Sequence, residues 1–288
     1  MSESTERLPA IPDPNCFLEL EDLHKSFGGT PVLSGVNMRV PKGKVTTILG
    51  GSGSGKSVML KHMIGLLRPD SGRVIVEGRD VTKLREREWI EVRKRFGYVF
   101  QAAALFDSLT VFENIAYPLR EHFDQTKAEL AHRVEGCLES VGLAGVGAKM
   151  PAELSGGMRK RVGVARAIAM RPQAILYDEP TTGLDPANSR RIGQLIRQLQ
   201  KELSVTSVVV THEPELCLAV SDHVVVLERG QLSIDAPVDE FRVSNAPAVR
   251  EFLGALYAPT AEAAASSDPA EPGEARDPTD RREERHGG

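Results

Sequence analysis

A glycine-rich segment between residues 50 and 57 has the composition and spacing of a phosphate-binding loop. It follows the pattern G-x-x-x-x-G-K-[ST], with Gly50 and Gly55 as the two fixed glycines. Glycines let backbone N–H groups converge on phosphate oxygens without side-chain clashes, and a helix that starts at such a loop favours anions. The predicted phosphate-binding residues are Gly50, Gly51, Ser52, Gly53, Ser54, Gly55, Lys56, Ser57 and the following Val58.

Two side chains of this loop have further predicted roles. Lys56 is placed to contact the β- and γ-phosphates of a nucleotide, and the Ser57 hydroxyl is placed to bind Mg²⁺. An apolar strand is predicted at 44–49 and a helix at 56–66, which is the context that the motif requires. The alternative is a turn rich in glycine and serine, and that context disfavours it.

A pair of carboxylates, Asp178 and Glu179, follows the apolar strand predicted at 173–177. The end of such a strand would bring Asp178 close to the Mg²⁺ held by Ser57. Glu179 would then point to the position from which a water attacks the γ-phosphate, so it is the predicted general base. Alone, two acidic residues at a strand end could equally be a solvated terminus. The phosphate loop upstream favours the catalytic interpretation.

The segment 154–158 reads LSGGM and precedes a helix predicted at 159–170. Ser155 and the backbone of Gly156 and Gly157 would form a second anion-binding helix start. Two phosphate sites far apart in one chain are hard to reconcile with one nucleotide in one monomer. The second site therefore favours an arrangement in which two subunits share each nucleotide.

The elements that must position these residues alternate along the chain. Strands are predicted at 17–23, 44–49, 73–77, 97–100, 173–177, 207–210 and 223–227, and helices at 56–66 and 186–203. The stretch 110–170 is predicted to be almost wholly helical, with a capping box formed by Thr110 and Glu113. The fold class is therefore α/β with an inserted helical subdomain at about 102–170. Residues 1–16 are predicted to be a flexible leader, 17–258 the folded domain and 259–288 a disordered tail.

Composition excludes some classes of function. Lysine and arginine number 36 against 40 aspartate and glutamate, a net charge of −4, so no nucleic-acid partner is expected. No apolar stretch approaches the roughly 18 residues that span a bilayer, and the N-terminus lacks the pattern of a signal peptide. A membrane role would therefore need a partner. Cys16, Cys137 and Cys217 form no CxxC pair, so buried thiols in a reducing compartment are favoured over metal or redox chemistry.

Together these motifs resemble the ATP-binding-cassette (ABC) family over residues 17–232. The resemblance implies a P-loop NTPase cassette with a RecA-like α/β core and a β-rich N-terminal part. It also implies a homodimer that encloses two ATP with Mg²⁺. By the family pattern, Phe27 stacks on adenine, Gln101 senses the Mg²⁺ and couples to a partner, Asp185 lies where a loop crosses the dimer, and His212 contacts the γ-phosphate. Each has a structural alternative: a core Phe, a surface Gln, a capping Asp and a core His.

Two residues depart from the family pattern. Met158 stands where a glutamine usually ends the LSGGQ stretch, which removes a side-chain polar contact but keeps the backbone donors. Val58 stands where a second hydroxyl is common, which removes a contact to the α-phosphate but no Mg²⁺ ligand. ATPase activity is expected to survive both changes.

The stretch 102–121, which contains LFDSLTVFEN and PLRE, resembles cassettes of the Mla/Mce-associated phospholipid transporters. That resemblance implies separate permease subunits, an Mce-domain lipid-binding protein and in some systems a STAS-domain protein. It also implies a peripheral location on the cytoplasmic face of the inner membrane. Leu105, Phe106, Leu109 and Val111 could line the groove that grips the permease, or they could belong to the core of the helical subdomain.

Three other classes of function stay open at this level. An ABC importer for amino acids or another solute would carry the same cassette chemistry. A soluble ABC ATPase of translation or DNA repair would typically show two cassettes or a long coiled-coil insertion, and neither is evident. A catalytically dead scaffold would have lost Lys56, Glu179 or His212, and all three are present.

Overall fold

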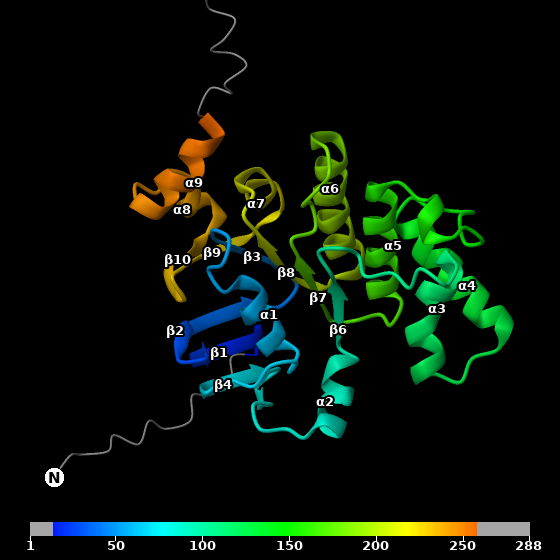
Figure 1. Ribbon diagram of the computed structural model, residues 1–288, viewed down its shortest axis with the longest axis horizontal. Coiled ribbons are helices and arrows are strands. Elements are labelled where there is room, and N and C mark those ends of the chain that lie inside the picture. Colours follow the sequence, from blue (N-terminus) through cyan, green and yellow to red (C-terminus); the bar gives the residue numbers. More distant parts are fainter. Residues whose placement is uncertain (1–13, 258–288) are drawn as a thin grey trace, which may run out of the picture.

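Two β-sheets and a group of helices make up the part of the chain that the computed structural model describes, residues 14–257 (Figure 1). The predicted tail at 259–288 and residues 1–13 of the predicted leader lie outside the described residues. The first strand begins at Cys16, the last residue of that leader, and the last helix ends at Tyr257. The fold is α/β with two sheets, which confirms the predicted α/β fold class with a β-rich N-terminal part.

A four-stranded antiparallel sheet forms the N-terminal part, in the order β2-β1-β4-β5. Its strands are β1 (Cys16–Phe27), β2 (Thr30–Pro41), β4 (Ser71–Val76) and β5 (Arg79–Asp80). The strand predicted at 17–23 is therefore longer than expected, and β2 was not predicted. The alternation in β2 is broken by Gly35, which has a positive φ of 72° and interrupts the pairing with β1.

A six-stranded sheet forms the centre of the described region, in the order β10-β9-β3-β8-β7-β6. Five of its strands run parallel: β3 (Val45–Leu49), β6 (Phe96–Val99), β7 (Ala174–Asp178), β8 (Thr206–Thr211) and β9 (His223–Glu228). They confirm the predicted buried strands within one or two residues. The edge strand β10 (Gln231–Pro237) is antiparallel, half exposed and was not predicted.

The helices fall into separate groups around these sheets, as Figure 1 shows. Helix α1 (Lys56–Met63) lies between the two sheets, and α2 (Glu86–Arg93) lies near β6. The helical subdomain contains α3 (Val111–His122), α4 (Lys127–Ser140), the short η1 (Pro151–Glu153) and α5 (Gly156–Ile168). The remaining helices are α6 (Pro186–Leu203), α7 (Pro214–Val220), α8 (Val238–Val243) and α9 (Pro247–Tyr257).

Capping explains where several helices begin. The predicted capping box at Thr110 is confirmed: its hydroxyl accepts from the backbone N–H of Glu113 at 3.2 Å, and the Glu113 carboxylate accepts in return. Helix α6 occupies the predicted range 186–203, started by Asp185 and ended by Ser204 in the left-handed region. The expectation of nearly continuous helix over 110–170 is wrong for residues 123–126, between α3 and α4, and for residues 141–155, between α4 and α5, apart from the short η1. Gly142 and Gly145 take positive φ there and break the helix.

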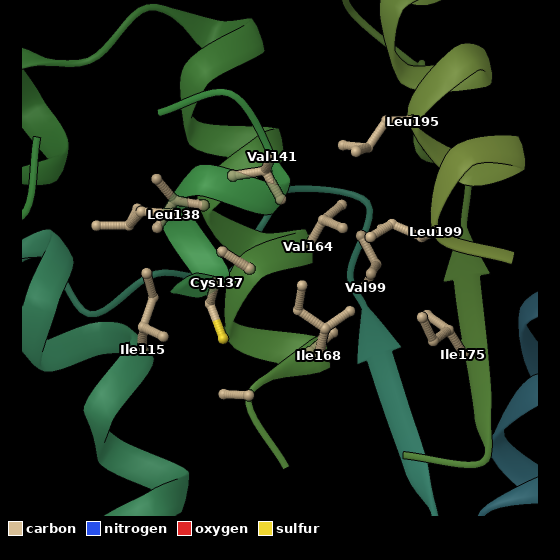
Figure 2. Close-up of a cluster of buried hydrophobic side chains, with 14 of the residues drawn as sticks. Val99, Ile115, Cys137, Leu138, Val141, Val164, Ile168, Ile175, Leu195 and Leu199 are labelled. Carbon is tan, nitrogen blue, oxygen red and sulfur yellow. The ribbon is translucent and has the colours of Figure 1, made fainter. Parts of the chain in front are cut away.

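The central sheet is buried on both faces, which is why its strands are almost uninterruptedly apolar. Along β7, Ile175 and Tyr177 face the helical subdomain and α6, whereas Ala174 and Leu176 face the antiparallel sheet and α1. Figure 2 shows the first of these two cores, with side chains from β6, α3, α4, α5, β7 and α6 meeting in one cluster. The helical subdomain therefore packs directly against β6 and β7, the two strands at one side of the central sheet.

The turn after α1, the helix of the phosphate loop, packs against α2. Gly65 adopts a φ of +66°, and a Cβ built on it would lie 2.2 Å from the buried ring of Trp89. Arg93 of α2 donates to the carbonyl of Gly65 at 3.0 Å and to that of Ile64 at 2.9 Å. The predicted helix 56–66 ends early at Met63 because the chain must turn here.

Replacing Gly65 with alanine should strongly destabilise the protein. A left-handed backbone costs an alanine about 1–2 kcal/mol, and forcing a methyl group into a packed site costs about 1–3 kcal/mol. We expect Gly65→Ala to lower the free energy of unfolding, measured in urea, by about 2–5 kcal/mol. Gly136→Ala is the control: it lies inside α4 with nothing within 4 Å of its built Cβ, and should stabilise by about 0.5–1 kcal/mol. Equal effects of the two changes would contradict this account.

Candidate functional site

The predicted phosphate loop connects β3 to α1, as the motif requires. Two of its glycines have positive φ, 75° at Gly53 and 107° at Gly55, where Gly55 caps α1. A Cβ on Gly50 would lie 2.6 Å from the carbonyl oxygen of Leu227 and 2.7 Å from the Ser54 hydroxyl. Larger residues would therefore either strain this backbone or push it away from β9. Gly51 and Ser52 complete the predicted phosphate-binding stretch, with Val58 on the first turn of α1.

Lys56 is a buried cation held across the loop. Its Nζ donates to the carbonyls of Gly50 at 2.8 Å and Gly51 at 2.9 Å, and lies 3.4 Å from Oε1 of Glu179. The side chain is 6% exposed. The two backbone contacts fix the ammonium at the centre of the loop, which is the position from which a lysine binds phosphate oxygens.

Ser57 and Asp178 meet in space although 121 residues separate them: the Ser57 hydroxyl donates to Oδ1 of Asp178 at 2.9 Å. The other carboxylate oxygen of Asp178 accepts from the hydroxyl of Tyr98 at 3.0 Å. Hydroxyl and carboxylate oxygens are the ligands that Mg²⁺ prefers, so this pair fits the predicted metal. With Gln101, these two residues make up the predicted metal set.

Tyr98 was not identified from the sequence as part of the site. It lies on β6, and β6 pairs in parallel with β7, so its side chain reaches the carboxyl end of the strand that carries Asp178. Burial and the neighbouring Asp178 carboxylate raise the pKa of Tyr98 well above its usual range, which keeps the phenol protonated as a donor. The strand order that brings them together cannot be read from one strand alone.

Glu179 lies at the end of β7 with its carboxylate fixed by several partners. Oε2 is 2.8 Å from Nδ1 of His212 and accepts from the Thr182 hydroxyl at 3.3 Å, while Oε1 faces Lys56. Its backbone adopts a φ of +49°, an unusual conformation for a residue with a side chain. The structure thus brings the predicted base, Lys56 and His212 into one cluster at the carboxyl edge of the central sheet.

The LSGGM segment begins α5. The Ser155 side chain accepts from the backbone N–H of Met158 at 3.3 Å, and a Cβ on Gly157 would lie 2.9 Å from Oδ1 of Asn188 on α6. Asp185 caps α6 by accepting from Ala187 and Asn188, each at 3.0 Å. The starts of α5 and α6 therefore lie together. The phosphate loop is at the start of α1, in a different part of the molecule (Figure 1).

Met158, which replaces the usual glutamine, packs its side chain against the first core cluster. Gly156 has the Leu184 side chain as the nearest neighbour of its built Cβ, at 3.8 Å. Helix α5 begins at Gly156 with Ser155 as its N-cap, so Gly156, Gly157 and Met158 form its first turn. That the LSGGM segment binds the nucleotide of a partner subunit stays a prediction.

Phe27 and Gln101 are both exposed at the surface. The Phe27 ring is 46% exposed at the end of β1, with the Lys25 ammonium 5.4 Å from its centroid. Gln101 follows β6, and its backbone carbonyl accepts a hydrogen bond from the ammonium of Lys160. Phe27 is therefore not a core residue. Stacking on adenine and Mg²⁺ sensing by these two residues stay predictions.

The apolar residues after Gln101 divide into two sets. Val111 is fully buried, and Leu105 packs against the core, so the core interpretation holds for both; Leu109 is half-buried. Phe106 is 46% exposed, with its ring centroid 5.1 Å from that of the exposed Tyr117. Asn114, fully buried and not foreseen, donates to the carbonyls of Phe106, Leu109 and Thr110 and fixes this loop.

The three cysteines are buried, and burial raises the pKa of Cys137 and raises that of Cys217 to about 12. The thiols of Cys137 and Cys217 are therefore poor nucleophiles at neutral pH. Across residues 14–257, no helix combines the length and apolarity that crossing a bilayer requires.

Comparisons with known proteins agree with this geometry. The ABC transporter family model matches residues 33–182. The probable ribonucleotide transport ATP-binding protein mkl of Mycobacterium tuberculosis is 42% identical over 250 residues, covering 87% of this chain and 68% of that protein. The intermembrane phospholipid transport system ATP-binding protein MlaF of Haemophilus influenzae is 39% identical over 237 residues, covering 82% and 90%. The methionine import ATP-binding protein MetN of Mesorhizobium japonicum is 39% identical over 240 residues, covering 83% and 66%.

The fold has solved counterparts as well. The dimeric post-hydrolysis structure of the ATP-binding cassette MJ0796, bound to ADP and Pi, superimposes with a TM-score of 0.71 at 31% identity. That match covers 77% of this chain and 98% of the other. The motifs, the site geometry and the relatives lead to the same assignment: the chain belongs to the ABC transporter family, as an ATP-binding cassette that hydrolyses ATP.

Proposed function

We propose that this chain is the ATP-hydrolysing subunit of a membrane transporter that moves phospholipid between bacterial membranes. It would work as a homodimer bound to separate permease subunits at the cytoplasmic face of the inner membrane. An Mce-domain lipid-binding protein, and in some systems a STAS-domain protein, would complete the assembly. The observation that carries the lipid assignment is the match to MlaF, which spans nearly all of that protein.

The alternatives are importers for other solutes. The relatives mkl and MetN are named for ribonucleotide transport and methionine import, and their identities of 42% and 39% equal or exceed the 39% of MlaF. However, about a third of each lies outside its match to this chain, whereas about a tenth of MlaF does. The LFDSLTVFEN and PLRE segments also resemble the lipid group. Both observations favour phospholipid over the other two cargoes.

The arrangement around Glu179 supports its role as general base. Its carboxylate lies between His212 and the ammonium of Lys56, so a water held there would face both a proton acceptor and the γ-phosphate that Lys56 binds. Ser57 and Asp178 would hold Mg²⁺, which neutralises phosphate charge when bound. His212, half-exposed at the edge of the cluster, would contact the γ-phosphate and restrain the base.

The homodimer follows from the separation of the two anion-binding helix starts. The start of α5 lies beside the start of α6, since a Cβ built on Gly157 would meet Asn188. Helix α1, which follows the phosphate loop, lies apart from α5 (Figure 1). A second copy placed head to tail would bring its signature segment over the nucleotide of the first. The dimeric state of MJ0796 supports this arrangement.

Glu179→Gln should abolish turnover but not ATP binding. The amide keeps the shape of the carboxylate and cannot accept a proton, so we expect phosphate release to fall about 10²- to 10⁴-fold. With hydrolysis blocked, the variant should accumulate an ATP-bound dimer on size-exclusion chromatography. Glu121→Gln, an exposed carboxylate on α3, is the control and should behave as the unaltered chain. Undiminished hydrolysis in Glu179→Gln would remove this residue from its role as base.

Tyr98→Phe should raise the Mg²⁺ requirement of the ATPase. Without the phenol, one oxygen of Asp178 loses its donor, and the carboxylate is free to rotate away from Ser57. Groups that orient a metal ligand typically contribute about 10- to 100-fold in metal affinity or activity. A titration of ATPase rate against Mg²⁺ measures the shift, with the exposed Tyr117→Phe as control. An identical Mg²⁺ dependence in both variants would show that Tyr98 does not orient the carboxylate.

The cargo is tested by purifying the chain with its partners from native membranes. We expect permease subunits, an Mce-domain protein and bound phospholipid, identified by mass spectrometry of proteins and of extracted lipids. Recovery of a solute-binding protein that binds methionine or ribonucleotides would overturn the lipid proposal and leave the ATPase assignment intact.

The Phe106→Asp variant should no longer bind the permease, while its affinity for ATP stays unchanged. The substitution places a charge beside Tyr117 in the expected docking groove. Phe123→Asp, at 44% exposure, is the matched aromatic control.

A further inference from the structure

Lys160 is a buried cation in the interior of α5 that the proposed catalytic scheme does not use. The residue is 7% exposed. Its ammonium donates to the backbone carbonyl of Gln101 and, at 3.4 Å, to the backbone carbonyl of Glu179. One side chain on the signature helix therefore touches both the loop that follows β6 and the residue proposed as general base.

The two backbone segments that Lys160 contacts are strained. Glu179 has a φ of +49°, and after Gln101 the chain passes through Ala103 at +61° and Ala104 at +47°. Residues other than glycine hold such conformations when the surrounding structure fixes them from several directions. Both strained segments thus depend on partners outside their own stretch of chain.

Helix α5 supplies these partners from one face. Arg166 donates to the carbonyl of Ala104 at 2.7 Å and to that of Ala103 at 2.8 Å. Gly163, between the two cations, lies close enough that its built Cβ would be 3.4 Å from the Cβ of Ala103. The loop after Gln101 is therefore fastened along α5 at Lys160 and Arg166. Lys160 alone of these three also reaches the catalytic strand end.

Burial lowers the pKa of Lys160, while the carboxylates of Glu179, Glu213 and Asp178 favour its charged form. A buried ammonium with carbonyl partners is costly to place, and its hydrogen bonds to two separate segments offset that cost. Both of its hydrogen bonds go to backbone carbonyls of segments outside α5. A purely structural lysine would stabilise the fold without affecting the geometry of the catalytic carboxylate in particular.

We propose that Lys160 is a positioning residue for ATP hydrolysis. Its ammonium ties the start of α5, the loop after Gln101 and the backbone of Glu179 into one unit. The signature segment is at the beginning of the same helix, so a shift of α5 when Ser155 meets a nucleotide would be transmitted to the Glu179 carboxylate. This inference rests on the proposed role of Glu179 as general base.

The test compares Lys160→Met, Lys160→Arg and Lys160→Gln in the full-length chain. The methionine keeps the unbranched apolar stem and removes the charge and the donors. We expect its kcat to fall about 10- to 100-fold, as for a catalytic group displaced by a fraction of an ångström, with the KM for ATP close to that of the unaltered chain. Arginine keeps the charge and the donors, so it should restore part of kcat, and glutamine should lie between the two.

Lys201→Met is the matched control, since Lys201 is an exposed lysine on α6. An unchanged kcat in Lys160→Met would overturn the proposal. So would a joint loss of kcat, ATP affinity and thermal stability that arginine does not restore, because that pattern indicates a purely structural role. Glu179→Gln, assayed in parallel, separates the two ideas: if it keeps hydrolysing ATP, the general-base assignment fails independently of the result at Lys160.

Discussion

The buried contact between Lys56 and Glu179 constrains much of this structure. A lysine and a glutamate at 6% and 10% side-chain exposure are expensive to remove from water unless other groups satisfy their charges. Lys56 is satisfied by two carbonyls of the phosphate loop, and Glu179 by His212 and Thr182. Losing either member would leave the other charge buried without its partner. The glycines of the loop and the left-handed turn at Glu179 are the backbone geometry that this arrangement requires.

The parallel sheet is what makes the contact possible. Strands β3, β7 and β8 are adjacent and point the same way, so the phosphate loop, the two carboxylates and His212 emerge at one edge. β6, on the other side of β7, adds Tyr98. Because both faces of the sheet are buried, these strand ends are held by two separate cores. The chemistry is thus supported by a sheet that is packed on both faces.

Helix α5 connects that edge to the helical subdomain. Its beginning carries the signature segment, and its interior holds the loop after Gln101 through Lys160 and Arg166. The same loop continues to Phe106, whose position is fixed by the buried Asn114. A permease that presses on Phe106 and a nucleotide that meets Ser155 would therefore act on one continuous set of contacts. Under the proposed function, this continuity would be a physical basis for coupling transport to hydrolysis.

The sequence by itself determined the motifs, because the phosphate loop, the Asp178–Glu179 strand end and the Thr110 cap each depend on residues close together along the chain. It likewise indicated the parallel strands through their unbroken apolar runs. The half-exposed β10 and the Gly35-interrupted β2 gave weaker periodic signals and were missed. The prediction of helix across residues 141–155 was wrong because Gly142 and Gly145 take positive φ after α4 ends.

Tertiary structure alone decided which distant residues meet. Tyr98 reaches Asp178 because β6 and β7 are neighbours in the sheet. Lys160 reaches the backbone of Glu179 because α5 packs against β6, the neighbour of β7. Neither contact has a local signal, since each joins chain segments whose proximity follows from strand order and helix packing. Val111 illustrates the same limit: the sequence allows it in a groove or in the core, and its full burial in the fold places it in the core. Short-range spacing specifies motifs, whereas packing over long sequence separations specifies their partners.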